Sequence, residues 1–523
     1  MSTPSRPTTS HATTPCPFAS YPVTPHPAAP HPAGSHPTAS HPAGPHTALP
    51  HPAAPHPTAA YPSGPHPAGP CPVTSRSTAF RSTGHPHTAA HTAAHPAKPA
   101  PTGFRSATAP GALPVVGHAW HLATRPVEFL SSLRRLGDLV EIRLGPRPAH
   151  VCCHPDLLRH VLVHDRVFDR GGPALDRVRD LIGNGLGTCG HAEHRAQRRM
   201  IQPAFHPERL RRYARVMAEE ADAAVGAWRP GEVADVHPAL QALSRRIVVR
   251  TLFAEDSPEV VHDVQRGVET LLRGFLPLML VPRGLRRALT AVHRPHRLAE
   301  RSLRDAVERL AAARPPGGLV DELAPLTADQ VHDQVMTMLV AAVETTAATM
   351  TWCLTRLARH PEVQDAVRAE AIAVSDPADL TCARRVLNET LRLHHPTVLI
   401  TRTVTEPVEL AGTALPRGAT IMTSPAVVHL SEDDYPRPML FDPDRWDPAR
   451  TAAPPHGAFL PFGGGARRCI GDAYATTEAT LTLAALTRKW RLSLAPGADL
   501  RTTMRGAVPC PRRALLRFDA HRE

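Results

Sequence analysis

A single cysteine lies in a glycine-rich stretch of the sequence, at residues 462–471 (FGGGARRCIG). Glycines let the backbone approach a flat ligand closely and adopt positive φ angles. Backbone N–H groups directed at the Cys469 sulfur, with the start of a helix beyond it, would stabilise a thiolate. Arg467 would then meet an anionic group on the same ligand. A buried structural cysteine beside a turn is the plainer alternative.

The stretch contains every constant position of the haem-binding signature of the cytochrome P-450 family, F-x-x-G-x-R-x-C-x-G. The chain therefore resembles that family, in its soluble bacterial form. The resemblance implies haem b as the cofactor, Cys469 as the iron ligand, and Phe462, Gly465 and Arg467 as further parts of the haem site. An anionic sulfur ligand favours cleavage of the O–O bond, so the implied activity is that of a monooxygenase.

A long helix is predicted over residues 327–359, beginning with a Thr-x-x-Gln capping box and ending before a His-Pro pair. Polar residues interrupt its apolar run at 341–346 (AAVETT). A threonine in mid-helix often only bonds back to a carbonyl group, which is the alternative here. The run is similar to the family's oxygen-activation motif, which implies that Thr345 hydrogen-bonds dioxygen and Glu344 relays protons. Ala342 stands where glycine is usual and leaves less room in the groove.

A carboxylate and a guanidinium, Glu389 and Arg392, are one helical turn apart on the same face. An exposed pair of this kind contributes only a few tenths of a kcal/mol. The surrounding residues resemble the family's E-x-x-R helix, and Arg445 follows in the family's second arginine segment. The resemblance therefore implies that these three residues stabilise the core beneath the haem.

His194 and Arg198 are spaced i,i+4 in a basic helical pattern, and both can donate hydrogen bonds to a carboxylate. A solvated basic helix face is the alternative. The resemblance implies that both contact the haem propionates, together with Arg402 and Arg467, and that His429 is a further partner.

The N-terminal part of the sequence has a different composition. Residues 16–71 follow a five-residue repeat of His-Pro and related pairs, and no Asp or Glu precedes Glu128. Such a segment has few large apolar groups to bury. We predict a disordered tail with polyproline-II character over residues 1–102 and one catalytic domain over 103–523. Loose metal binding by the evenly spaced imidazoles, or a start of translation downstream, are the alternatives.

Hydrophobic periodicity predicts a fold that is mostly α with a small β part. Strands are predicted at 140–144, 149–153, 398–404 and 420–423, and helical patterns dominate up to about residue 393. Residues 168–190 are predicted to form a long loop that covers the ligand. The resemblance places the haem between the long helix and the cysteine loop.

Charge and cysteine usage restrict the partners. The chain has a net charge of +12, of which the part after residue 127 carries half. This mild excess favours docking of an acidic protein over nucleic-acid binding. No signal pattern or apolar run long enough to cross a bilayer is evident, and no paired cysteine framework is present. We expect a soluble, cytoplasmic monomer.

Electrons are expected to come from separate proteins, because little sequence follows Cys469. The resemblance implies ferredoxin and ferredoxin reductase as donors. The surplus arginines Arg195, Arg199 and Arg468 would form the docking patch.

Two shorter stretches, 168–173 (FDRGGP) and 183–189 (GNGLGTC), resemble actinobacterial terpene-oxidising members of the family. The resemblance implies a rigid, apolar small-molecule substrate, with walls formed by the covering loop, residues 340–343 and residues 398–400. The alternatives are a polyketide or fatty-acid substrate, or a peroxide-driven or gas-sensing haem-thiolate protein.

Overall fold

The computed structural model describes residues 103–255, 262–263, 267, 301–309, 318–374, 376–450, 454, 457–505 and 508–521. The contact pattern divides the chain into two units, Met1–Pro96 and Ala97–Glu523. The N-terminal tail predicted from the sequence lies outside the described residues. All of the described residues belong to the second unit.

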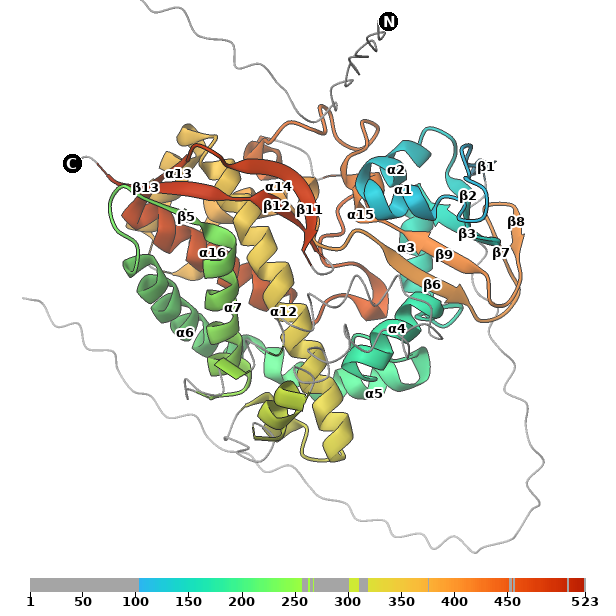
Figure 1. The fold of residues 1–523 in the computed structure, drawn as a ribbon, viewed down its shortest axis with the longest axis horizontal. Coiled ribbons are helices and arrows are strands. Elements are labelled where there is room, and N and C mark those ends of the chain that lie inside the picture. Colours follow the sequence, from blue (N-terminus) through green and yellow to red (C-terminus); the bar gives the residue numbers. More distant parts are fainter. Residues whose placement is uncertain are drawn as a thin grey trace, which may run out of the picture. The chain divides into compact units, whose positions relative to one another are not determined.

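Helices make up most of the second unit, as predicted (Figure 1). At its centre is α12 (Ala328–Leu357), which begins with the predicted capping box: Thr327 and Gln330 each accept a hydrogen bond from the other's backbone N–H. Three helices pack on α12: α7 (Val236–Leu252), α14 (Thr381–Leu393) and α16 (Asp472–Lys489).

The remaining described helices surround this group. They are α1 (Ala119–Thr124), α2 (Pro126–Leu133), α3 (Pro155–Val163), α4 (Pro173–Ile182), α5 (His191–Ile201), α6 (Pro207–Gly226), α11 (Leu319–Glu322), α13 (Pro361–Ala373) and α15 (Pro425–His429). Single 3₁₀ turns are η1 (Gln202–Phe205), η2 (Pro377–Asp379), η3 (Pro443–Trp446) and η4 (Gly465–Arg467).

The β part is small, as predicted, and its largest sheet has the strand order β1-β2-β3-β9-β6-β4. The strands of this sheet are β1 (Ser106–Thr108), β2 (Leu139–Leu144), β3 (Arg147–Cys152), β4 (Phe168–Asp169), β6 (Ile400–Val404) and β9 (Thr420–Thr423). The other sheets contain β5 (Glu232–Asp235), β7 (Val408–Leu410), β8 (Thr413–Leu415), β10 (Trp490–Leu494), β11 (Asp499–Arg505), β12 (Val508–Arg513) and β13 (Leu515–Ala520). All four strand regions predicted from the sequence form strands of the largest sheet.

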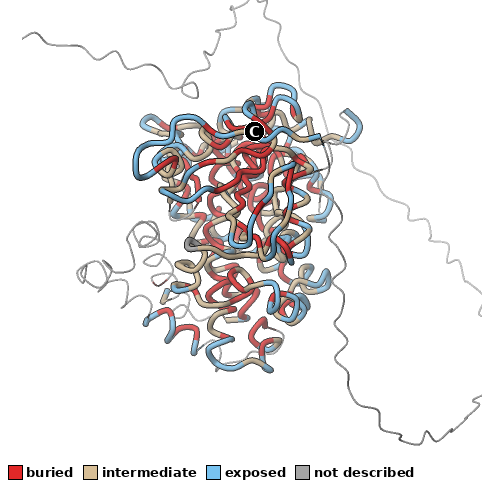
Figure 2. The backbone as a smooth tube through the Cα atoms, turned by 90° about the vertical axis from the view of Figure 1, so that its right-hand side faces the viewer, coloured by how far each residue is buried: buried red, intermediate tan, exposed pale blue. Residues whose placement is uncertain are grey.

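The core lies mainly among the helices, with smaller apolar clusters beside the sheet. Buried backbone runs through the interior of this unit and exposed backbone lies around it (Figure 2). Ile247 of α7, Met350 of α12 and Leu483 of α16 are all fully buried in the main cluster. Their packing fixes the position of α12 relative to the loop that precedes α16.

The core helix α12 corrects the expectation that the chain contains no apolar run long enough to cross a bilayer. In the described part of the chain, α12 is the one helix that is long and apolar enough to cross a membrane. Of its most apolar window, 78% is buried inside the protein. Threonines and Glu344 interrupt this apolar run, so the run was not recognised in the sequence. Because most of it is buried inside the protein, its apolar character is that of a core helix.

The prediction of a long loop over residues 168–190 is also wrong. Strand β4 pairs with β6 at Phe168 and Asp169, and α4 follows with a proline in its first turn. Proline is well tolerated there because its missing N–H has no partner in a helix start. The apolar residues of α4 are helically spaced, but the glycines on both sides made the segment look irregular.

Candidate active site

A cavity of about 440 Å³ lies between α12 and the loop that precedes α16. Ala341, Ala342 and Thr345 line it from α12, whereas the neighbouring Glu344 is buried in the protein. Ala341 is exposed although it lies in the middle of a core helix. The accessible face of α12 is therefore the wall of this cavity.

The cysteine loop forms the opposite wall, where Phe462, Gly463 and Cys469 line the cavity. The Cys469 N–H donates to the Phe462 carbonyl at 2.9 Å, which closes the loop. Cys469 is exposed as a residue and lines the cavity, but burial raises the pKa of its thiol, and a hydrogen bond from the Gly471 N–H opposes that shift. A coordinated metal ion deprotonates such a thiol outright, so the position suits a metal ligand.

Gly465, expected in the haem site, does not line the cavity. Its φ is +66° and a Cβ there would lie 2.2 Å from the Leu162 carbonyl oxygen of α3. The glycine is required for the close packing of η4 on α3. The signature thus preserves the shape of the loop at this position.

The basic residues expected at the propionates come together. His194 and Arg198 of α5, Arg402 of β6 and Arg467 of η4 all line the cavity, although they come from three distant parts of the sequence. Burial, first, and the neighbouring arginines lower the pKa of His194 to about 4. The arginines, and not His194, therefore supply the positive charge near pH 7.

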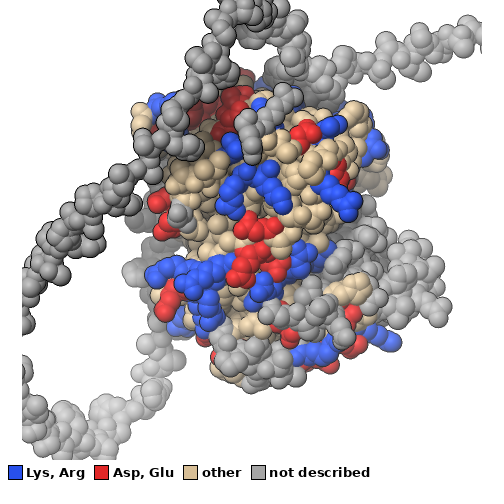
Figure 3. All heavy atoms as spheres, turned by 90° about the vertical axis from the view of Figure 1, so that its left-hand side faces the viewer, with Lys and Arg blue, Asp and Glu red and all other residues tan. Residues whose placement is uncertain are grey.

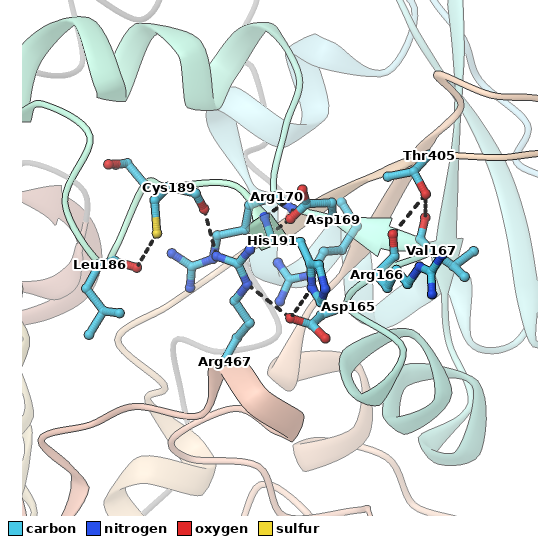
Figure 4. Close-up of polar contacts among 12 residues, drawn as sticks. Asp165, Arg166, Val167, Asp169, Arg170, Leu186, Cys189, His191, Thr405 and Arg467 are labelled. Atoms are coloured by element: carbon cyan, nitrogen blue, oxygen red, sulfur yellow. Dashed lines mark hydrogen bonds and ion pairs between the residues drawn. The ribbon is translucent and has the colours of Figure 1, made fainter. Parts of the chain in front are cut away.

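Arg467 is already balanced by carboxylates of this chain (Figure 4). Its guanidinium donates to Asp169 Oδ1 at 2.8 Å, and its Nε lies 3.5 Å from Asp165 Oδ2. It also donates to the Cys189 carbonyl at 2.7 Å. Arg467 therefore holds the β4–α5 region against the cysteine loop, a role that its place in the motif did not predict.

Arg170 is a cavity-lining cation that the sequence reasoning missed. In the described part of the chain, neither Arg170 nor Arg402 has a carboxylate within ion-pair distance. The Arg402 Nε is buried without a hydrogen-bond partner. Burial lowers the pKa of Arg402 to about 9 and that of Arg170 to about 10. The feature of the sequence that could have indicated Arg170 is the FDRGGP stretch, in which Arg170 directly follows Asp169, an ion-pair partner of Arg467.

These observations fit a haem. A cysteine sulfur is on one wall, a helix with small residues is on the other, and the guanidinium groups of Arg170 and Arg402 lie at the edge without a carboxylate partner among the described residues. Two carboxylates of a bound haem would balance the charges of Arg170 and Arg402. Arg402 is buried and Arg170 is half-buried, and charges without partners are costly at such positions, so a bound dicarboxylate would stabilise this edge of the cavity.

His429 does not line the cavity, in contrast to the expectation. Its side chain is fully buried, and its Nε2 accepts the Leu460 N–H at 2.9 Å. Its carbonyl group accepts from Arg392 at 2.9 Å. The structure thus places His429 behind the loop that leads to the cysteine.

The two residues of the oxygen-activation motif face different ways. Thr345 lines the cavity, and its hydroxyl donates to the Ala341 carbonyl at 2.6 Å. Glu344 is only 3% exposed and lies outside the cavity lining. Its Oε2 accepts from Gln241 Nε2 on α7 at 2.6 Å.

The E-x-x-R residues form a fully buried network beneath the cysteine loop. Arg392 donates from Nε and Nη2 to the two oxygens of Glu389, at 2.9 and 2.8 Å. Trp446 Nε1 donates to Glu389 at 3.0 Å, and Arg445 Nε lies 3.6 Å from it. This bidentate geometry supports the structural role expected for the three charged residues.

The apolar part of the wall differs in detail from the expectation. Leu186 of the predicted covering loop and Ile400 of the predicted 398–400 wall line the cavity, as does Met338, which lies two positions before the predicted 340–343 wall. Val340, Val343 and residues 398–399 are not among the lining residues. Helical rotation turns positions 340 and 343 of α12 away from the cavity face that contains 338, 341 and 345.

The fold and this site define a class of haem-thiolate proteins, and comparison with known proteins agrees. The sequence profile of the cytochrome P450 family matches residues 108–516. The chain belongs to this family, whose members bind haem b through a cysteine ligand and act as monooxygenases.

Named relatives are similar over most of the chain. Pentalenene oxygenase of Streptomyces avermitilis is 42% identical over 439 residues, covering 80% of this chain and 98% of the relative. Cyclooctatin synthase of Streptomyces melanosporofaciens is 41% identical and covers 77% of this chain and 94% of the relative. Cyclooctat-9-en-7-ol 5-monooxygenase of the same organism is 38% identical, with 79% and 95% covered.

Solved structures share the fold. A six-coordinated cytochrome P450 from Thermus thermophilus has a TM-score of 0.62 at 25% identity, covering 75% of this chain and 98% of that chain. A second structure, from another strain of the same organism, has a TM-score of 0.66 at 24% identity, with 79% and 100% covered. At that identity the second comparison bears on the fold alone.

Proposed function

We propose that this monooxygenase oxidises a terpenoid at an unactivated carbon. The observation that carries the proposal is an apolar cavity wall, with Leu186, Met338 and Ile400, opposite the cysteine loop. Such a wall binds a rigid hydrocarbon by burial of apolar surface. The three relatives named above are called pentalenene oxygenase, cyclooctatin synthase and cyclooctat-9-en-7-ol 5-monooxygenase, which supports this substrate class.

In the proposed site, Cys469 would ligate the iron of a haem, and Arg170, Arg198, Arg402 and Arg467 would hold its propionates. A haem with an anionic sulfur ligand supplies the activation of O₂ when it is bound there. Ala341 and Ala342 are small, so they leave space between α12 and the cysteine loop. Thr345 also lines this space, and its hydroxyl, which donates to the Ala341 carbonyl in the structure, would turn toward the space to hydrogen-bond dioxygen.

Glu344 is proposed to relay protons to the cavity through Thr345. A carboxyl group suits this role because it can gain and lose a proton at moderate cost. Glu344 is one residue from Thr345 in α12, but its carboxyl group faces α7. Delivery therefore requires a rotation of the Glu344 side chain toward the cavity.

We further propose that ferredoxin, reduced by ferredoxin reductase, docks beside α5. Arg195, Arg199 and Arg468 are exposed there. By contrast, the face that includes α6 shows basic and acidic groups side by side (Figure 3). Ion pairs such as Arg488–Asp222 and Arg246–Glu220 join α6 to its neighbours. Arg468 is paired with Asp472 at 2.8 Å, but Arg195 and Arg199 have no carboxylate within ion-pair distance among the described residues. The α5 surface thus offers positive charge to an acidic protein partner.

A panel of ligands tests the substrate class. Purified holoenzyme is titrated with terpene hydrocarbons, polyketides and fatty acids, and the low-to-high spin shift in absorbance is recorded. We expect shifts with terpenes, since displacement of solvent from the iron needs a ligand that fits the apolar wall. Shifts with polyketides or fatty acids but not terpenes would overturn the substrate proposal.

The assignment of Cys469 has its own test. Cys469→Ser is expected to lose the thiolate signature in the absorbance of the reduced, carbon-monoxide-treated protein. Cys382→Ser, on α14 and half-buried, is the matched control and should keep it. An unchanged spectrum in Cys469→Ser would contradict the proposed ligand.

A further inference from the structure

The carboxyl group of Glu344 is held by α7 and not by the cavity wall. Gln241 Nε2 donates to Oε2 at 2.6 Å, and His237 Nε2 lies 3.6 Å from Oε1. Among the described residues, these are the side chains that contact the carboxyl group. A buried carboxylate requires hydrogen bonds and an opposite charge. His237 is the group in contact that can supply that charge.

The surroundings of His237 favour a proton on the nitrogen that faces Glu344. The imidazole is fully buried, and its Nδ1 lies 3.1 Å from Thr351 Oγ1 and 3.3 Å from Cys510 Sγ. The Thr351 hydroxyl already donates to the Ala347 carbonyl at 2.7 Å. The Thr351 oxygen can therefore accept a hydrogen bond from a proton on Nδ1. The Glu344 carboxyl group lies on the Nε2 side, so both ring nitrogens face an acceptor, which is the arrangement that an imidazolium requires.

Other titratable groups near this cluster have partners of their own. Asp235 caps the start of α7, and Arg505 of β11 lies 3.7 Å from it. Glu478 of α16 is hydrogen-bonded to Ser244, a different residue of α7, at 2.5 Å. His237 and Glu344 are therefore the interacting titratable pair at this point of the α7–α12 contact.

We propose that His237 is a positioning residue for proton delivery, which shares one proton with Glu344 while Gln241 fixes the carboxyl group in place. At rest the pair is imidazolium and carboxylate. Transfer of the proton from His237 Nε2 to Glu344 Oε1 leaves a neutral imidazole and a carboxylic acid, and no other bond changes. The neutral acid can leave α7 and rotate toward Thr345 without moving a bare charge through the core. This inference rests on the proposed relay role of Glu344.

Infrared spectroscopy of the full-length holoenzyme tests the pair directly. The carboxylic C=O band that is lost in Glu344→Gln identifies this group, and its disappearance is followed as pH rises. In His237→Phe we expect the midpoint to rise by one pH unit or more, a tenfold gain in proton affinity, because the carboxylate loses its counter-charge. His237→Gln, which keeps a donor but cannot become charged, should show the same rise.

Ser244→Ala is the matched control, since Ser244 is also buried on α7 but contacts Glu478. Its Glu344 midpoint should equal that of the wild type. A midpoint that is unchanged in both His237 variants, or that rises equally in Ser244→Ala, would overturn the proposal.

Coupling of electrons to product provides the functional readout. His237→Phe and His237→Gln should release about tenfold more hydrogen peroxide per product, with unchanged haem content and unchanged carbon-monoxide spectrum. The double variant His237→Phe/Glu344→Gln should be no worse than Glu344→Gln alone, because both act on one step. Normal coupling in Glu344→Gln would refute the relay role of Glu344. Uncoupling in Glu344→Gln but in neither His237 variant would refute the role of His237 alone.

Discussion

Single residues determine the charge balance at the edge of the cavity. Arg467 is paired with Asp165 and Asp169, whereas Arg170 and Arg402 have no carboxylate partner in the part of the chain that the structure describes. An uncompensated buried guanidinium is unfavourable. Binding of a dicarboxylate cofactor therefore removes a cost that the protein alone carries.

We predict that Arg170→Gln weakens haem retention about tenfold, since a hydrogen bond to a charged group contributes about 1.5–3 kcal/mol. The rate of haem transfer to an apo-globin acceptor measures it. Arg166→Gln removes a charge from an exposed residue four positions earlier and should leave the rate unchanged. Equal rates in the two variants would show that Arg170 does not hold the cofactor.

Two glycines of the cysteine loop differ in how much space their surroundings leave for a side chain. Gly463 and Gly465 both have positive φ, +72° and +66°, but a Cβ at Gly463 meets nothing within 4 Å. In each alanine variant the left-handed backbone costs about 1–2 kcal/mol. We predict that Gly465→Ala loses a further ~1–3 kcal/mol through the clash with the Leu162 carbonyl. Denaturant unfolding of both holoproteins measures the difference, and equal midpoints would contradict the packing argument.

At the scale of elements, a buried ion pair joins α14 to the segment around η3. Glu389 receives hydrogen bonds from Arg392 within α14 and from Trp446 in η3. These contacts hold the loop that leads to Cys469 against the helical core. The network therefore supports the cofactor loop from below without touching the cavity.

We predict that Glu389→Gln destabilises the fold by about 3–5 kcal/mol, because it leaves the buried Arg392 without a counter-charge. Arg488→Gln breaks the half-exposed pair with Asp222 and should cost at most about 1 kcal/mol. Unfolding midpoints in urea measure both changes. A loss in Glu389→Gln as small as in Arg488→Gln would argue against a supporting role for the network.

For the molecule as a whole, buried titratable groups make stability depend on pH. Burial raises the pKa of Glu478 from 4.5 to about 8, and Ser244 opposes the shift. The folded state thus holds this proton more tightly than the unfolded chain does. The contribution of Glu478 to stability is complete below pH 4.5 and is lost as pH rises to about 8.

We therefore predict that Glu478→Gln removes a fall in stability between pH 5 and pH 8 that is on the order of a few kcal/mol in the wild type. Unfolding midpoints at both pH values measure the slope. His194, with a pKa lowered to about 4, acts in the opposite sense, so its contribution is lost as pH falls from 6.5 to 4. An identical slope in Glu478→Gln and wild type would assign the pH dependence to other groups.

Deletion of residues 1–102 tests the proposed domain boundary. We expect the shortened protein to keep its haem content and its turnover, because every residue assigned to the cavity lies after position 160. Absorbance and product formation measure both. Loss of haem on deletion would show that the N-terminal segment contributes to the catalytic unit.

Patterns within short stretches allowed correct predictions. The capping box and apolar run predicted α12, alternation predicted β2, β3, β6 and β9, and the spacing around Cys469 predicted the cavity loop. Local hydrogen bonding and backbone geometry act over a few residues, so periodicity and motif spacing carry this information. The amphipathic helix α4 was missed because the flanking glycines obscured its short pattern.

Side-chain partners were beyond the reach of such patterns. Arg467 and Asp169 are 298 positions apart, and Gln241 and Glu344 are 103 apart. Only the packing of η4 near β4 shows that Arg467 is compensated and that Arg170 is not, and only the packing of α7 on α12 shows that Glu344 faces His237. The type of chemistry follows from a contiguous motif, whereas the compensation of buried charge depends on which distant side chains folding brings within hydrogen-bond distance.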